Sequence, residues 1–327
     1  MSRGPRIAAF RGRSSPSRGL AEHSAARAFQ DNGCTVLTNQ AECVSKNISD
    51  LWHRRFCHQN IRGIANLKKG NFVHGLQDAN FDDTCECDVC NSCKIVNSSS
   101  SRTIEIATKG PLELLHMDLW GPAQVKSLGG SRYLLTVIDD FSRMAFAIPM
   151  PEKSRTLEEV QQLIRRLEKQ LDLKVRKIRS DNGSEFSNKL FAEFTSHQGI
   201  VHQFTNTYSP QMNGVAERFN RTLIEGTRSI LADSGLPKHF WAELANTFCY
   251  IKNRSSHAKL GGQTPISKFC GKTPSVQHFR IIGSKCTVLK RHQTAVASST
   301  LRGGRAYWWA TPVTPRGTES GTPLNVR

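Results

Sequence analysis

The chain has 327 residues, of which 45 are Lys or Arg and 27 are Asp or Glu, so its formal net charge is +18. This length accommodates one sizeable core plus a smaller module, and it excludes several enzymes in series. With 38% hydrophobic residues, the chain is not a long disordered protein. The positive charge favours a polyanionic partner such as nucleic acid. No run approaches the roughly 18 apolar residues of a membrane span, so we expect no membrane association.

Both ends of the chain are basic and lack hydrophobic periodicity. Residues 1–45 are rich in Arg, Ser and Gly, and we expect them to form a disordered basic arm. We expect residues 294–327 to form a disordered basic tail that binds the DNA backbone nonspecifically. No secretory signal is visible, and a chain of this size forms a core without disulfides, so a reducing compartment is expected.

The ten cysteines are unevenly distributed, and four of them fall within nine residues: Cys85, Cys87, Cys90 and Cys93. Such crowding favours a metal site over a disulfide framework. A pair of histidines with four residues between them precedes this cluster, and 28 residues separate the second histidine from Cys87. Tetrahedral zinc accepts two imidazoles and two thiolates. The sequence therefore predicts a structural zinc site, in a small and mostly helical module over residues 46–96, formed by His53, His58, Cys87 and Cys90. Cys93, three positions after Cys90, remains an alternative ligand.

Residues 97–107 are polar and predict a linker, after which the pattern changes to strands. An antiparallel meander of three strands is predicted over residues 112–119, 133–138 and 144–150. From Leu157 to Leu171, apolar residues recur every three or four positions, which predicts a helix with one buried face. Further strands are predicted at 175–180 and 201–204, and further helices near 188–197, from about 215 and over 237–253. This order predicts an α/β fold with helices flanking one mixed five-stranded sheet, as a core over residues 108–270 and an extension over 271–293.

Three acidic residues lie at the ends of predicted elements. Asp118 ends the first strand of the meander, Asp181 follows the strand at 175–180, and Glu217 opens the long helix. If the two strands are neighbours, a helix crossing their ends can bring all three carboxylates together. Magnesium prefers such oxygen ligands, and two ions roughly 4 Å apart could activate a nucleophile on a phosphodiester. Each acid alone has a simpler interpretation as a turn former or a helix cap. The other acids nearby are assigned to turns: Asp139, Asp140 and Glu185.

Basic residues follow Glu217 on the same predicted helix. Arg221 and Arg228 lie four and eleven positions after Glu217 and therefore share its face, where they could hold DNA phosphates in register. We expect two further DNA contacts, Arg218 beside Glu217 and Asn213 in the loop that precedes the helix. The alternative interpretation of each Arg is a solvated charged face.

Six segments together closely resemble the integrase of Copia-type LTR retrotransposons: LWHRRFCH (51–58), CDVC (87–90), DLWGP (118–122), IDDFSR (138–143), RSDNG (179–183) and PQMNGVAERFNRT (210–222). The 35 residues between Asp181 and Glu217 match the D,D(35)E pattern of retroviral and retrotransposon integrases. The resemblance covers about residues 50–290. Cys93 stands where this family commonly has Gly, which keeps the choice of cysteine pair open.

The resemblance implies a pre-integrase zinc-binding module followed by an RNase H-like catalytic core. By motif position, Asp118, Asp181 and Glu217 would bind Mg²⁺ or Mn²⁺, and the two histidines with Cys87 and Cys90 would bind Zn²⁺. The implied activity is 3′-end processing of element DNA and strand transfer into a target duplex. The implied working form is a homo-oligomer in the nucleus, with the cytoplasm as the alternative location.

The ends of the chain match nothing in that family, and the protease, reverse transcriptase and RNase H regions of the polyprotein are missing, which predicts a fragment of an element or a gene derived from one. The alternative function is a catalytically inactive or co-opted fragment that binds DNA. A nuclease acting on RNA–DNA hybrids is disfavoured by the 35-residue spacing and the zinc module.

Overall fold

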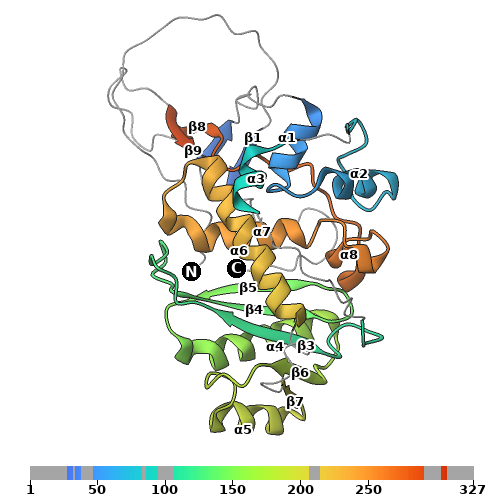
Figure 1. Ribbon diagram of the computed structural model, residues 1–327, viewed down its shortest axis with the longest axis vertical. Helices are drawn as coiled ribbons and strands as arrows, with labels where there is room; N and C mark the ends of the chain where they lie inside the picture. Colours follow the sequence, from blue (N-terminus) through green and yellow to red (C-terminus); the bar gives the residue numbers. More distant parts are fainter. Residues whose placement is uncertain are drawn as a thin grey trace, which may run out of the picture.

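A computed structural model describes residues 28–31, 34–37, 47–82, 86–94, 106–205, 214–290 and 303–307. Its central element is a five-stranded sheet of order β5-β4-β3-β6-β7 (Figure 1). The strands are β3 (Leu115–Trp120), β4 (Tyr133–Asp139), β5 (Ala145–Met150), β6 (Lys177–Ser180) and β7 (Val201–Phe204). The first three form an antiparallel meander, whereas β6 and β7 run parallel to β3. The predicted mixed sheet is therefore confirmed, and its order is that of an RNase H-like fold.

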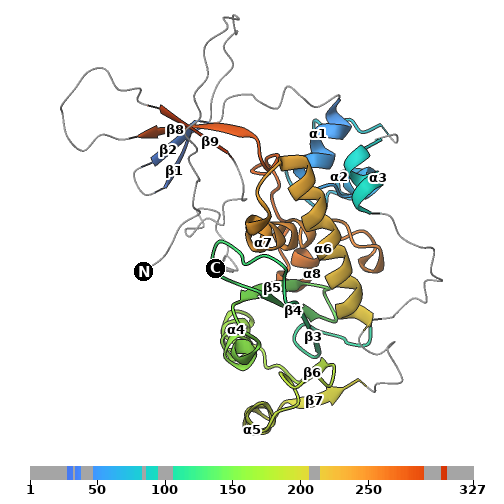
Figure 2. The ribbon, with the colours of Figure 1, turned by 60° about the vertical axis from the view of Figure 1, so that its left-hand side comes forward.

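Helices cover both faces of this sheet (Figure 2). Helices α4 (Thr156–Leu171) and α5 (Lys189–Gln198) pack on one face, and α6 (Gly214–Ser234) and α7 (Trp241–Lys252) pack on the other. Alternate residues of β4 enter the two cores, since Leu135 faces α4 and Leu134 faces α6 and α7. The helix predicted from the apolar spacing is α4, and Val160, Ile164 and Leu167 on its predicted face are buried.

The two helices beside the sheet approach closely at Gly226 of α6. A Cβ atom at this position would lie 1.9 Å from Cε2 of Phe248, whose ring is buried on α7. Only glycine permits this approach without displacing the ring. The contact fixes α6 against α7, and thereby fixes the helix that carries Glu217 against the sheet.

The mostly helical module predicted over residues 46–96 contains α1 (Ile48–Arg55), α2 (Ile61–Lys69) and α3 (Asp88–Cys93). Its apolar residues join one hydrophobic cluster with α6, α7 and residues 276–282. The rings of Phe56 and Phe279 meet at 5.0 Å, and His74 exchanges backbone hydrogen bonds with the segment 274–276. The module, the core and the extension therefore share one packed interior. The last short helix, α8 (Pro265–Cys270), instead packs through Ile266 and Phe269 into the cluster on the α4 side of the sheet.

A buried polar network stands where the sequence predicted only a turn at Asp139 and Asp140. Asp140 Oδ1 lies 3.0 Å from His116 Nε2 and 3.3 Å from an Arg143 guanidinium nitrogen, and its Oδ2 accepts hydrogen bonds from Ala107 and Thr108. Burial alone would raise the pKa of Asp140, but His116 and Arg143 lower it to about 2. The network ties the start of the core domain to strand β3.

A second, antiparallel sheet has the order β1-β2-β8-β9. Its strands are β1 (Ala28–Asp31), β2 (Cys34–Leu37), β8 (Lys285–Lys290) and β9 (Gly303–Tyr307). The expectation of disorder over residues 1–45 and 294–327 is thus wrong for β1, β2 and β9. Each of these strands has only four or five residues, and β2 pairs with residues of β8 that lie 250 to 256 positions further along the chain. The remainder of the arm and tail, and residues 97–105 of the linker, lie outside the described residues. No helix in the described part of the chain is long and apolar enough to span a membrane.

Candidate active site and metal centre

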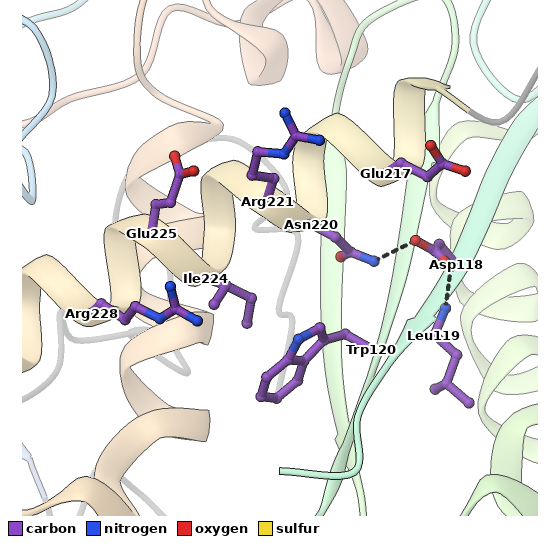
Figure 3. A pocket seen from close by; sticks show the side chains of 9 residues that line it. All are labelled: Asp118, Leu119, Trp120, Glu217, Asn220, Arg221, Ile224, Glu225 and Arg228. Carbon is purple, nitrogen blue, oxygen red and sulfur yellow. Dashed lines mark hydrogen bonds between the residues drawn. The ribbon is translucent and has the colours of Figure 1, made fainter. Parts of the chain in front are cut away.

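The parallel pairing of β3 with β6 brings two of the predicted carboxylates to one edge of the sheet. His116 is opposite Arg179 in the register, so Asp118 and Asp181, each two residues further along, lie at adjacent positions. Glu217 belongs to the first turn of α6, which crosses β3 at this edge (Figure 3). Strands β3 and β6 are neighbours, as the predicted meeting of the three carboxylates requires.

Asp118 is held in place by two hydrogen bonds. Its Oδ1 accepts the backbone N–H of Leu119 at 2.9 Å, and its Oδ2 accepts Nδ2 of Asn220 on α6 at 2.7 Å (Figure 3). Burial raises the pKa of Asp118, and the charges of Asp181 and Glu217 raise it further, whereas the two hydrogen bonds oppose the rise. Three negative charges so close together favour a bound cation.

Asp181 has a second role in the turn that follows β6. Its Oδ1 accepts the backbone N–H of Gly183 at 3.1 Å, which is the Asx-turn contact expected of the Asp-Asn-Gly sequence. Glu185 lies in the same turn, is largely buried, and pairs with Lys153 at 3.5 Å. One carboxylate oxygen of Asp181 therefore shapes the backbone, and the charge of the group still acts on Asp118.

The donor set at this edge suits a hard divalent cation, because carboxylate oxygens are the ligands that magnesium prefers. The three carboxylate groups lie near one another, but their oxygen atoms are not all within 4.8 Å of one another. Among the described residues, only the His/Cys cluster places three or more ligand atoms within 4.8 Å of one another. An open carboxylate site of this kind leaves room for phosphate and water oxygens to complete the ligand shell.

A groove of about 360 Å³ runs from Asp118 along α6 (Figure 3). Arg221 and Arg228, both predicted DNA contacts, line it together with Trp120. Arg218 is exposed and is not part of the lining, and Asn213 lies outside the described residues. The lining residues are Asp118, Leu119, Trp120, Glu217, Asn220, Arg221, Ile224, Glu225 and Arg228.

Asn220 and Trp120 are two of the five groove residues that were not predicted from the sequence. Asn220 is three positions after Glu217 and one helical turn along the same face, a spacing that could have indicated its contact with the site. Trp120 packs edge-to-face on Trp241 of α7, with ring centroids 5.6 Å apart, and Trp241 donates from Nε1 to the carbonyl of Val125. No local pattern indicates the Trp120–Trp241 pairing, because 120 residues separate the partners.

The second site lies in the helical module, where four predicted ligands meet. Nδ1 of His58 lies 3.2 Å from Nε2 of His53 and 3.4 Å from Sγ of Cys87. Sγ of Cys90 lies 3.3 Å from Nε2 of His53 and 3.8 Å from Nδ1 of His58. A tetrahedral ion with Zn–N bonds of about 2.0 Å and Zn–S bonds of about 2.3 Å separates its ligands by roughly 3.3 Å for N···N and 3.5 Å for N···S. The four atoms therefore have the spacing of a zinc tetrahedron.

The protonation states around this cluster suit metal binding. Burial, with the charge of His58, lowers the pKa of His53 to about 4, so its imidazole is neutral at pH 7. Burial raises the pKa of the Cys90 thiol to about 11, against the opposing charge of Lys94, so a thiolate there requires a compensating cation. Cys93 is outside the cluster, and Cys85 lies outside the described residues.

Comparison with known families identifies the two parts of the chain. Residues 108–210 match the model of the integrase core domain, and residues 29–95 match the GAG-pre-integrase domain. The fold and these matches define an RNase H-like integrase core preceded by a pre-integrase module. These two domains, an integrase core and a GAG-pre-integrase domain, are consistent with the integrase region of a Copia-type retrotransposon. The second match begins at residue 29, so it includes β2 and all but the first residue of β1, which the expected module boundary at residue 46 left out.

Among curated proteins, the chain is 34% identical over 240 residues to the retrovirus-related Pol polyprotein from transposon TNT 1-94 of Nicotiana tabacum. The match covers 72% of this chain and 18% of the relative, so the chain spans about a fifth of that polyprotein. Two solved structures of the HTLV-2 integrase catalytic core domain in complex with magnesium, in trimeric and dimeric forms, are 19% and 21% identical with TM-scores of 0.38 and 0.37. Each match covers 49% of this chain and 97% of the HTLV-2 chain.

Proposed function

We propose that the chain is a metal-dependent polynucleotidyl transferase that processes the 3′ ends of element DNA and joins them to a target duplex. The observation that carries this proposal is the parallel register of β3 and β6, which aligns Asp118 with Asp181 under the start of α6. The groove beside them contains two arginines from the same helix face, as a bound phosphodiester backbone requires.

The chain's own residues would position the reactants. Asn220 and the Leu119 N–H fix the two oxygens of Asp118, the Gly183 N–H fixes one oxygen of Asp181, and the first turn of α6 presents Glu217. When Mg²⁺ or Mn²⁺ is bound by these three carboxylates, it would polarise the phosphate and lower the pKa of the attacking hydroxyl. In processing, the oxygen of water attacks; in joining, the terminal 3′-hydroxyl attacks. A new P–O bond forms, the original P–O3′ bond breaks, and the departing 3′-oxygen takes a proton. No bond to the protein is needed.

DNA contacts by Arg221 and Arg228 belong to this proposal, and so do contacts by Arg218 and Asn213. Pairing two DNA ends requires more than one active site, which favours a homo-oligomer. The substrate implies a nuclear location for the working protein. Zinc bound by His53, His58, Cys87 and Cys90 would be structural, because four protein ligands leave no position for a catalytic water.

The test is a strand-transfer assay with purified full-length chain, a short duplex carrying element-end sequence, and Mg²⁺ or Mn²⁺. Joining or nicking that requires the cation and all three carboxylates supports the proposal. The second candidate is a co-opted fragment that binds DNA without cutting it, favoured by the incomplete closure of the carboxylates. Salt-sensitive DNA binding without any joining would support that candidate instead.

A further inference from the structure

Helix α6 connects the two sites described above. Glu217 is in its first turn, and Asp233 is next to its last residue, Ser234. Asp233 lies against the pre-integrase module, where its Oδ2 accepts Nε of Arg54 at 3.0 Å. The same oxygen lies 3.4 Å from Nε2 of His58, one of the four clustered residues. The end of the helix opposite Glu217 therefore touches the candidate zinc site.

The two histidines of the cluster use different ring nitrogens. His53 faces its partners through Nε2, while its Nδ1 lies 2.8 Å from the carbonyl of Gln59. His58 faces its partners through Nδ1, so a metal bound there leaves the ring proton on Nε2. That nitrogen is buried, has no close hydrogen-bond partner in the described part of the chain, and has Asp233 as its ion-pair contact.

A metal-binding imidazole ordinarily donates its other N–H to a carboxylate or a carbonyl, which sets its tautomer and its orientation. Gln59 supplies the carbonyl for His53 from within the module. For His58 the available acceptor is Asp233, and it comes from the core domain. Arg54, on α1, binds the same oxygen and holds the carboxylate close to the ring.

We propose that Asp233 is a positioning residue of the zinc site, which accepts the Nε2–H of His58 and so couples zinc binding in the pre-integrase module to the C-terminal end of the catalytic helix. This inference rests on the proposed zinc site. The shared apolar cluster supports the coupling, since Phe56 of the module and Ile230 of α6 are buried in one interior. Closing the tetrahedron around His58 would thus order the end of α6, and loss of zinc would loosen it.

The test measures zinc affinity of the full-length chain by competition with a chromophoric chelator at pH 7, for wild type, Asp233→Asn and Asp233→Ala. The Ala variant is expected to bind zinc about 10–100-fold more weakly, and the Asn variant, which keeps a neutral acceptor oxygen, should fall between the two. The control is Glu193→Gln, an exposed acid of α5 that pairs with Lys189 at 3.7 Å, and it should leave the affinity unchanged.

Two further measurements separate positioning from a loss of folding. The visible absorption bands of Co²⁺-loaded protein should shift in Asp233→Ala while its far-ultraviolet circular dichroism stays that of wild type. Chelation of zinc from wild type should speed amide exchange in residues 226–234, and in the Ala variant this exchange should already be fast with zinc bound. Wild-type affinity and unshifted Co²⁺ bands in Asp233→Ala would overturn the inference. Wild type that binds no zinc would instead refute the proposed zinc site itself.

Discussion

Asn220 of α6 donates a hydrogen bond of 2.7 Å to Oδ2 of Asp118 on β3, and this contact joins the helix that carries Glu217 to the strand that carries the first carboxylate. Because an ionised carboxylate only accepts hydrogen bonds, the amide presents its NH₂ group. The bond orients Asp118 and sets the position of α6 over the sheet edge.

Replacing Asn220 by alanine should therefore lower strand-transfer activity about 10–100-fold and raise the Mg²⁺ concentration needed for half-maximal rate, since Asp118 loses the partner that orients it. The measurement is the rate as a function of Mg²⁺ concentration. Thr222→Ala, on the same helix, removes only a bond to the backbone of Arg218 and serves as the control. An Asn220→Ala protein with an unchanged Mg²⁺ profile would show that the contact does not orient the site.

Gly226→Ala should destabilise the fold. The added methyl group would lie 1.9 Å from the buried ring of Phe248, and we expect a loss of about 1–3 kcal/mol in the free energy of unfolding, measured with denaturant. Gly63→Ala on α2 is the matched control, because its methyl group would lie 3.9 Å from Cβ of Ser256, an ordinary van der Waals contact. Helix propensity makes that substitution neutral or stabilising. Equal stability of the two variants would contradict the packing described at Gly226.

Asp140→Asn should cost about 3 kcal/mol at pH 7, because it leaves His116 and Arg143 without their buried partner charge. The pKa of Asp140 in the folded chain is about 2, below its ordinary value of 3.8. A depressed pKa contributes stability that is complete above the unfolded value and is lost as the pH falls toward 2. Unfolding measured from pH 7 to pH 2 should therefore show the difference between wild type and variant shrinking between about pH 4 and pH 2. A difference that stays constant over this range would contradict the assigned ion pairs.

Removal of zinc should destabilise the pre-integrase module, and Cys90→Ser should lose most of the zinc that wild type retains after dialysis. Cys93→Ser is the matched control, since Cys93 is outside the cluster and should keep about one Zn²⁺ per chain. Elemental analysis measures both. Full zinc content in Cys90→Ser, or loss of zinc in Cys93→Ser, would contradict the assignment of Cys90 as the ligand and would indicate Cys93 instead.

The sequence predicted the sheet and its flanking helices because their signals are local. A short apolar run bounded by turns marks β4, and an apolar repeat of three and four positions marks α4. Both elements were found within one or two residues of their expected bounds. The clustered ligands could be predicted from their spacing, since a zinc site built from two short ligand pairs produces a recognisable pattern in the sequence.

Contacts between residues far apart in the sequence have no such local pattern and were not predicted. Asn220 with Asp118, Trp120 with Trp241 and Asp233 with His58 join elements whose proximity depends on the complete fold. The second sheet was missed for the same reason, because β2 pairs with β8 across more than 200 residues of intervening chain. The acids at 139 and 140 were assigned to a turn, although their burial arises from the packing of β3 and β4 around them.

The most direct test of the catalytic account is strand transfer by the full chain in Mg²⁺, with Glu217→Gln, which keeps the shape of the side chain and removes its charge. Wild type should join DNA ends to a target duplex, and Glu217→Gln should lose at least about 100-fold in rate while retaining DNA binding and thermal stability. Glu193→Gln should match wild type. Joining by Glu217→Gln at the wild-type rate, or no joining by wild type in either Mg²⁺ or Mn²⁺, would contradict the account.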